Sequence, residues 1–420
     1  MRAAAVEGSE ENAEPIPQDT GGAAQALDWR LILPVIVIVS MYAAGMAAVM
    51  PVLPFYVREM GGSPLILGVV IAVEALSQFL SAPVLGQLSD RYGRKRTLLG
   101  SQLVAAVSLL LLASAPNLVF ILLARALFGM AAGNLSAAAA YVADHSSAGN
   151  RRQAMGILAG GVGLGGVVGA GLSGLLADTS LTAPVYVALV FTLLSIVVTL
   201  YRLKGGQPTP RPHGQADGQR ISFRAVLESP VIRILIIVMM CHLFAYGMYS
   251  SQVPVFLADT FTWNGHAFGP KELSYIMMAD GVINVLVQFF LLGWLGRYFT
   301  ERNLIIAIFA LLGVGFLTAG LATTIPVLAF AVLCVSTADA IAKPTYLAAL
   351  SVHVPPQRQG VVMGTAQALM AVTDIVSPVL AGFILGYALY GIWIGVAIAV
   401  ALAGAVVAIA RLPEADACPS

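Results

Sequence analysis

The chain has 420 residues, of which 59% are hydrophobic and 10% are charged, and its mean hydropathy is +0.87. Soluble domains use about 45–50% apolar residues, so this composition excludes an ordinary soluble protein and indicates a helical membrane protein with many spans. The formal net charge of +1 gives no support to nucleic-acid binding, and three cysteines, two of them in apolar runs, predict no disulfide framework.

Polar and mostly acidic residues fill the first 30 positions, which predicts a disordered tail and not a signal peptide. Twelve apolar runs follow, each close to the length of about 20 residues that crosses a bilayer as a helix. We place the first six spans near 31–54, 65–86, 97–115, 118–142, 153–177 and 183–202. The other six lie near 231–258, 272–295, 302–322, 326–350, 360–386 and 388–411.

These spans predict an all-α fold of twelve transmembrane helices in two six-helix bundles with pseudo-twofold symmetry. The bundles cover 31–202 and 230–411, with a cytoplasmic linker rich in Pro, Gly and Arg at 203–229 and tails at 1–30 and 412–420. The halves repeat each other, since Gly86 shifted by 207 positions falls on Gly293 and Gly156 shifted by 208 falls on Gly364. Two repeats joined by a long linker suggest a substrate path between two bundles.

Basic residues lie mainly on one side of these spans. If the N-terminus is cytoplasmic, 18 of the 22 lysines and arginines are cytoplasmic, whereas Arg58 and Lys271 lie outside and Arg125 and Lys343 lie within spans. By the positive-inside rule, this asymmetry predicts a multi-pass protein with both termini in the cytoplasm.

The loop after the second span reads GQLSDRYGRKR at 86–96. It matches GxLxDRxGRKR, the signature of the major facilitator superfamily, which the chain resembles from about 31 to 411. Within that superfamily, MPVLP at 50–54, RALFG at 125–129 and YVAD at 141–144 resemble the twelve-span drug/proton antiporters, the tetracycline efflux proteins in particular. The resemblance implies alternating access, in which the two halves rock about a central cavity, and a bacterial inner membrane as the location.

The charge in this loop has two interpretations. Its basic residues can act only as a topology signal that holds the loop in the cytoplasm. Alternatively, its glycines permit a tight turn and its aspartate offers an anion to an arginine or a helix N-terminus. The resemblance implies that the motif latches the halves together, near Gly360, when the cavity faces outward. The predicted gating residues are Gly86, Asp90, Arg91, Gly93, Arg94 and Lys95.

Four glycines mark the fifth span: Gly156, Gly165, Gly169 and Gly174. They approximate the antiporter motif of the family, although Ala170 stands in place of its proline. Such glycines also let helices pack closely in lipid, so we predict a packing role and take the pattern as weak support for antiport.

Ionisable side chains within the spans need a reason, since a charge at the bilayer centre costs about 2.5–3.5 kcal/mol. Glu74 and Asp280 lie 12 and 13 residues before the matching glycines, which places them at similar depth in opposite halves. We expect them to face one cavity and to carry protons or attract a cation, unless Glu74 is simply paired with Arg125. Arg125 matches an arginine that the family resemblance links to proton coupling.

Other polar and aromatic side chains would suit a cavity for an amphipathic organic molecule. Asp339 and Lys343 are one helical turn apart and are expected to pair with each other, and His242 is either packed or part of a relay. The predicted cavity contains Tyr42, Gln78, Asn134, His242, Tyr246, Tyr249, Gln252, Asn284, Asp339, Lys343 and Asp374. The tetracycline efflux proteins carry acids where this chain has Tyr42 and Ser108, so we do not expect tetracycline to be handled by the family's mechanism.

The main prediction is a monomeric transporter, without cofactor or metal, that exports small amphipathic organic compounds against protons. The alternative keeps the fold but reverses the direction, giving an importer or facilitator of a nutrient or siderophore-like molecule. A sensor or membrane enzyme is a third possibility, which no HExxH, GxSxG or paired-cysteine motif supports.

Overall fold

A computed structural model describes residues 28–131, 133–147, 150–203, 229–354 and 359–413. The predicted tails and linker lie almost wholly outside these residues. Within the described ranges, 12 helices are long and apolar enough to cross a membrane. The predicted fold class of a twelve-span, all-α membrane protein is therefore confirmed.

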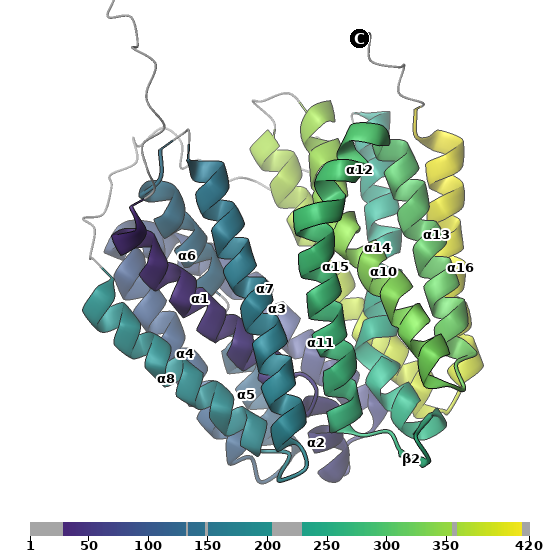
Figure 1. Cartoon of the computed structure of the whole chain (residues 1–420), viewed down its shortest axis with the longest axis horizontal. Coiled ribbons are helices and arrows are strands. Elements are labelled where there is room, and N and C mark those ends of the chain that lie inside the picture. The colour runs from purple at the N-terminus through teal and green to yellow at the C-terminus, as the bar shows by residue number, and fades with distance from the viewer. Residues whose placement is uncertain (1–27, 132, 148–149, 204–228, 355–358, 414–420) are drawn as a thin grey trace, which may run out of the picture.

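Eight helices are described in the first half of the chain, and Figure 1 shows how they are arranged. They are α1 (Trp29–Val49), α2 (Leu53–Glu59), α3 (Pro64–Tyr92), α4 (Arg94–Ala113), α5 (Leu118–Met130), α6 (Gly133–Asp144), α7 (Arg151–Leu176) and α8 (Ala183–Arg202). The second half begins with α10 (Pro230–Thr260), a two-stranded antiparallel hairpin of β1 (Thr262–Trp263) and β2 (His266–Ala267), and α11 (Pro270–Leu286). It continues with a π-helical segment η1 (Val287–Leu291), α12 (Leu292–Tyr298), α13 (Glu301–Gly320), α14 (Ile325–His353), α15 (Gln359–Gly386) and α16 (Tyr390–Arg411).

Proline and glycine set several of the boundaries. The first span was predicted to continue to residue 54, but α1 ends at Val49 and a separate short helix, α2, begins at Leu53. Pro51 lies in the break and Pro54 occupies the first turn of α2, where a proline needs no donor. Between α3 and α4, Gly93 adopts φ +89°, a conformation that favours glycine, so the two helices turn sharply within one residue.

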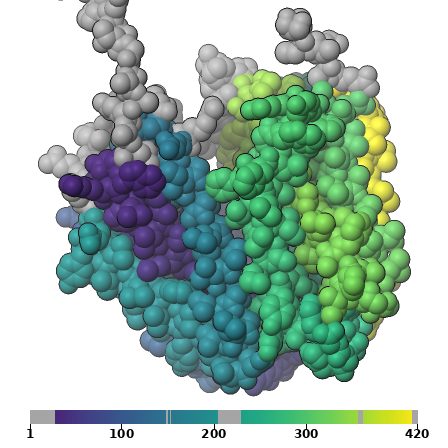
Figure 2. Space-filling model, viewed as in Figure 1, coloured from purple at the N-terminus to yellow at the C-terminus, as the bar shows by residue number. Residues whose placement is uncertain are grey.

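The helices form two groups that meet along α7 with α11 and α3 with α15 (Figure 1). Small residues permit close backbone approach there. A Cβ on Gly68 would lie 2.2 Å from the Pro378 carbonyl oxygen, and one on Gly382 would lie 2.4 Å from that of Pro64. These contacts lie near the end of the molecule that carries α2 and the hairpin, which we call the α2 end. α1 begins and α16 ends at the opposite end, where Figure 2 shows the two halves standing apart.

Candidate functional site

An ion pair is buried in the N-terminal half. Glu74 on α3 and Arg125 on α5 are 9% and 1% exposed, and the guanidinium donates a hydrogen bond to the carboxylate. Gly129, one turn beyond Arg125, allows the two helices to approach, because a Cβ there would lie 2.3 Å from the Glu74 carbonyl oxygen. Of the two predictions for Glu74, the structure shows pairing with Arg125 and not an open position at a shared cavity. The two charges cancel where water is excluded.

Aromatic rings close over this pair. The Arg125 guanidinium lies over the Phe128 ring, 5.0 Å from its centroid, a cation–π geometry. Tyr42 on α1 stacks on Phe128 with 6.1 Å between the ring centroids and interacts electrostatically with both members of the pair. Tyr42 thus lies beside the acid of α3 and the arginine of α5.

A cavity of about 110 Å³ lies inside the C-terminal half between α10, α11 and α14. Asp280 faces it together with Tyr246 and Tyr249, and apolar side chains such as Ile276 and Val332 complete the wall. Ser336 of α14 lines the cavity as well and interacts with the Asp280 carboxylate. Among the described residues, no cationic side chain forms an ion pair with Asp280. This carboxylate is therefore uncompensated, in contrast to Glu74.

The prediction that Asp339 pairs with Lys343 is wrong. Asp339 on α14 instead faces His242 on α10, with 3.7 Å between Oδ1 and Nε2. Lys343 forms no ion pair with Asp339 within the described residues and interacts electrostatically with Asp374 on α15. One helical turn brings Asp339 and Lys343 to one face, but packing between helices provides each with a different neighbour.

The remaining cavity candidates are dispersed. Gln252 is fully buried, and its Nε2 donates to the Pro64 carbonyl oxygen at 3.1 Å, a contact between the halves that removes it from any open cavity. Asn134 is 2% exposed and Gln78 is exposed. Asn284 accepts a hydrogen bond of 2.6 Å from Gln288. Of the predicted set, only Tyr246 and Tyr249 join Asp280 at the 110 Å³ cavity.

The signature loop makes its described contacts inside the N-terminal half. Arg94 lies 2.8 Å from Asp90 and 3.2 Å from Asp144, and it donates to the Ser89 hydroxyl at 2.9 Å. Lys95 donates to the Leu200 carbonyl oxygen at 2.8 Å, near the end of α8. Gly86 has open space around it, and Arg91 lies over the Tyr92 ring. The latch near Gly360 remains a prediction, since the side chains there lie outside the description.

Three of the four predicted glycines on α7 make close contacts. A Cβ on Gly165 or Gly169 would lie 2.2 or 2.0 Å from a carbonyl oxygen of α1, and one on Gly174 would lie 3.0 Å from Ser274 of α11. Gly156 has open space. The glycines therefore lie where α7 packs within its own half and against the other.

Ion pairs join the two halves at the α2 end, and sequence reasoning missed them. Arg58 on α2 lies 2.7 Å from Asp259 on α10, which also accepts a hydrogen bond of 3.0 Å from Tyr390. Lys271 on α11 lies 2.5 Å from Asp178, which follows α7. Arg58 and Lys271 are the two basic residues predicted on the outer side of the membrane, where basic residues are rare. Their unusual location could have indicated that each has an acidic partner there.

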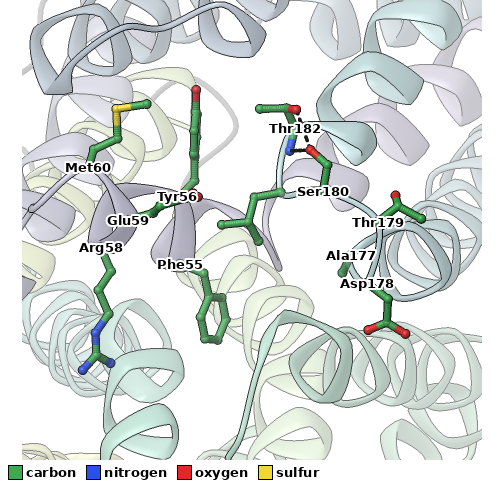
Figure 3. Close-up of a pocket in the computed structure, with 11 residues that line it drawn as sticks. Phe55, Tyr56, Arg58, Glu59, Met60, Ala177, Asp178, Thr179, Ser180 and Thr182 are labelled. Atoms are coloured by element: carbon green, nitrogen blue, oxygen red, sulfur yellow. Dashed lines mark hydrogen bonds between the residues drawn. The ribbon is translucent and has the colours of Figure 1, made fainter.

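A groove of about 980 Å³ runs between these ion pairs on the surface of the N-terminal half. Figure 3 shows Arg58 of α2 on one side and Asp178 on the other, with Phe55 and Tyr56 between them. Burial, and secondarily the Glu59 carboxylate, raise the pKa of Tyr56 above its ordinary value. Its hydroxyl stays protonated and donates to the Leu112 carbonyl oxygen at 3.2 Å, anchoring α2 to α4.

The family model of the Major Facilitator Superfamily matches residues 35–378, most of the membrane-spanning part of the chain. The chain belongs to this superfamily. Its members transport small molecules across membranes and are not a class of enzymes, so this chain is a transporter and acts on small-molecule substrates.

The relatives of this chain include tetracycline and multidrug resistance proteins. The chain is 32% identical over 353 residues to the tetracycline resistance protein, class C, of Escherichia coli, covering 81% of this chain and 86% of that protein. It is 26% identical over 356 residues to multidrug resistance protein 2 of Bacillus subtilis (strain 168), covering 81% and 85%. These relatives confirm the resemblance to drug efflux transporters that the sequence motifs indicated.

Solved structures share the fold. The nucleoside transporter NupG superimposes with a TM-score of 0.71 at 13% identity, covering 92% of this chain and 98% of that one. The human organic anion transporter MFSD10 (TETRAN) gives a TM-score of 0.64 at 20% identity, covering 91% and 98%. At such identities the likeness concerns the fold alone.

Proposed function

We propose that this protein exports small amphipathic organic compounds in exchange for protons, by alternating access between its two halves. The observation that carries the proposal is Asp280, a carboxylate within a membrane-spanning helix that faces a cavity and has no cationic partner among the described residues. The resistance names of the relatives support the direction of transport.

The argument from Asp280 is one of charge. An ionised carboxylate at bilayer depth is costly, so it is stabilised by taking up either a proton or a cationic ligand. The tyrosine rings and apolar side chains around it bind the hydrophobic part of such a ligand. Because one carboxylate does not hold both occupants, binding of one releases the other, which is the exchange that antiport requires. Arg125 and Glu74 hold the facing half in a fixed, neutral arrangement.

Alternating access follows from the contacts between the halves. Two ion pairs and the close glycine contacts hold the α2 end together. The described contacts of the signature loop, at the other end, stay within one half. With both termini cytoplasmic, this arrangement is the inward-facing state, ready to load substrate from the cytoplasm. We further propose that the protein works as a monomer in the inner membrane.

The test uses everted membrane vesicles in which a dye reports a pre-formed pH gradient, challenged with a panel of cationic and neutral amphipathic compounds. We expect a cationic compound to collapse the gradient in the wild type and not in Asp280→Asn. The matched control is Glu301→Gln, which removes a carboxylate at the start of α13, outside the cavity.

Failure has a defined meaning. If labelled compound crosses the membrane while the gradient persists in the wild type, proton coupling is wrong and the facilitator or importer alternative replaces it. That alternative is favoured by Tyr42 and Ala170, which stand where the resemblance predicts an acid in the first span and a proline in the fifth. If Asp280→Asn collapses the gradient as the wild type does, the coupling residue is wrong.

A further inference from the structure

The His242 side chain is fully enclosed within the C-terminal half. Its side chain is 0% exposed, and its ring stacks on Tyr246 at 6.3 Å and meets Tyr346 and Phe309 edge-on at 5.5 and 6.2 Å. Neither ring nitrogen has a hydrogen-bond partner among the described residues. Buried polar groups in proteins are rarely left unsatisfied, and those that are call for an explanation.

Asp339 offers the explanation. Its Oδ1 lies 3.7 Å from Nε2 of His242, too far for a hydrogen bond but within reach of an ion pair. A proton on Nε2 would give a charge-assisted hydrogen bond, whose length is about 2.7–2.9 Å, after a shift of about 1 Å or less. The Asp339 side chain is 32% exposed, whereas the His242 side chain is 0% exposed. The carboxylate therefore lies between the buried imidazole and the accessible space beside α14.

The charged groups around this pair are mostly negative. Asp280 on α11 and Asp374 on α15 both interact electrostatically with Asp339. The cation of the group is Lys343 on α14, which interacts with Asp374. The other titratable neighbours, neutral when protonated, are Cys241, Tyr246 and Tyr346. Three carboxylates against one ammonium leave excess negative charge around the imidazole.

We propose that His242 and Asp339 form a second proton-binding site, distinct from Asp280, and that its occupation sets how the carboxylates at the cavity respond to pH. The inference rests on the proposed proton coupling for its role in transport, but the binding of the proton does not depend on it. Histidine is the side chain that ordinarily changes charge between pH 5 and 8.

The consequence is a change at the cavity wall. When His242 takes a proton, Asp339 is drawn to α10 and its charge is compensated. The repulsion between Asp339 and Asp280 falls, and a cationic ligand that binds the Asp280 carboxylate displaces its proton to water. A proton at His242 therefore prepares the cavity for substrate, and the two sites act in sequence.

The test observes the histidine directly, by NMR of the full-length protein in detergent with isotope-labelled histidine side chains. The chain has five histidines, and removing them one at a time assigns the signals. We expect the His242 signal to change with pH, and we expect Asp339→Asn to alter that pH response, because the carboxylate is the group that faces Nε2. The control variant is His353→Gln, an exposed histidine at the end of α14 whose loss leaves the His242 titration unchanged.

Transport in proteoliposomes gives the second readout. We expect His242→Gln to flatten the pH dependence of substrate uptake between pH 5 and 8. A His242 signal that does not change over this range, or that titrates identically in Asp339→Asn, overturns the inference, even when transport is proton-coupled. A His242 that titrates as expected in a protein whose transport ignores the proton gradient upholds the proton site and overturns the proposed function instead.

Discussion

The two halves of this transporter bury charge in opposite ways. In the N-terminal half, Glu74 and Arg125 are closed off together and neutralise each other. In the C-terminal half, Asp280 faces a cavity and has no cationic partner among the described residues, and Asp339 lies 3.7 Å from a histidine. A closed pair resists changes of charge, whereas separated groups accept a proton or a ligand.

Helix packing follows the same division. In the N-terminal half, Gly165 and Gly169 bring the backbones of α7 and α1 together. The sequence repeat places Thr373 and Ser377 of α15 at the corresponding positions of the C-terminal half, where side chains replace the glycines. These positions thus carry glycines that bring two backbones together in one half, and buried polar side chains in the other, where Ser377 packs closely against Gly247 of α10. We expect the C-terminal half, with its separated charges, to respond to protons and ligands, and we call it the responsive half.

The largest expected effect tests the closed pair. Glu74→Gln leaves the Arg125 guanidinium buried without its counter-charge, and we expect the free energy of unfolding to fall by about 3–5 kcal/mol. Joining Arg125→Met to Glu74→Leu should recover most of that loss, since a well-packed apolar pair replaces a buried ion pair at little cost. Denaturation of purified protein in detergent measures both.

The control for this comparison is Asp144→Asn, which removes a partly exposed contact with Arg94 and should cost less than about 1 kcal/mol. If Glu74→Gln unfolds like the wild type, Glu74 does not carry the charge that holds Arg125. The claim that the N-terminal half buries a neutral ion pair would then be wrong, and with it the contrast between the halves.

A smaller effect is expected from packing. Gly169→Ala places a Cβ 2.0 Å from the Ala44 carbonyl oxygen, and such overpacking costs about 1–3 kcal/mol. Gly166→Ala on the same helix is the matched control, since its Cβ would meet nothing within 4 Å. In the other half, Ser377→Ala removes a buried hydroxyl that has no described hydrogen-bond partner, so we expect no loss of stability. Thermal unfolding in detergent compares the three variants, and equal losses for Gly169→Ala and Ser377→Ala would contradict the division.

Apolar run length sufficed to predict the twelve spans, because each helix must bury its backbone hydrogen bonds across the bilayer whatever its neighbours do. The break between α1 and α2 was missed, since the apolar run continues through Met50 and Val52 and hydropathy does not register the prolines. The Glu74–Arg125 pair was foreseen as an alternative, because two opposite buried charges in one bundle have few other partners.

Contacts between distant helices were harder to predict. Spacing along one helix suggested that Asp339 meets Lys343, but the rotation of α14 in the bundle presents Asp339 to α10 and leaves Lys343 near α15. Arg58 and Asp259 lie in different halves, and nothing local in either sequence points to the other. The sequence pattern thus predicted which charged side chains need partners, whereas the identity of each partner depends on how the helices pack.

The smallest expected effect concerns the ion pair between Arg58 and Asp259, which joins the two halves at the α2 end. Arg58→Gln breaks the ion pair with Asp259, and because the arginine is 57% exposed the pair contributes only about 0.2–1 kcal/mol. We expect the population open at the α2 end to rise about 1.4- to 5-fold, as that free energy requires. The measurement is the rate at which a membrane-impermeant maleimide labels Ser274→Cys, a buried position on α11 facing Gly174, in a background without the native cysteines.

His266→Gln is the control at the same end, because the contact between His266 and Glu272 lies within one half and does not hold the halves together. Faster labelling in Arg58→Gln but not in His266→Gln identifies the Arg58–Asp259 pair as part of the closure. Equal labelling in the two variants would mean that the glycine contacts of α3 with α15 close this end without help from charge. The weak ion pair would then be a consequence of closure, and the responsive half would owe its access to substrate to helix packing alone.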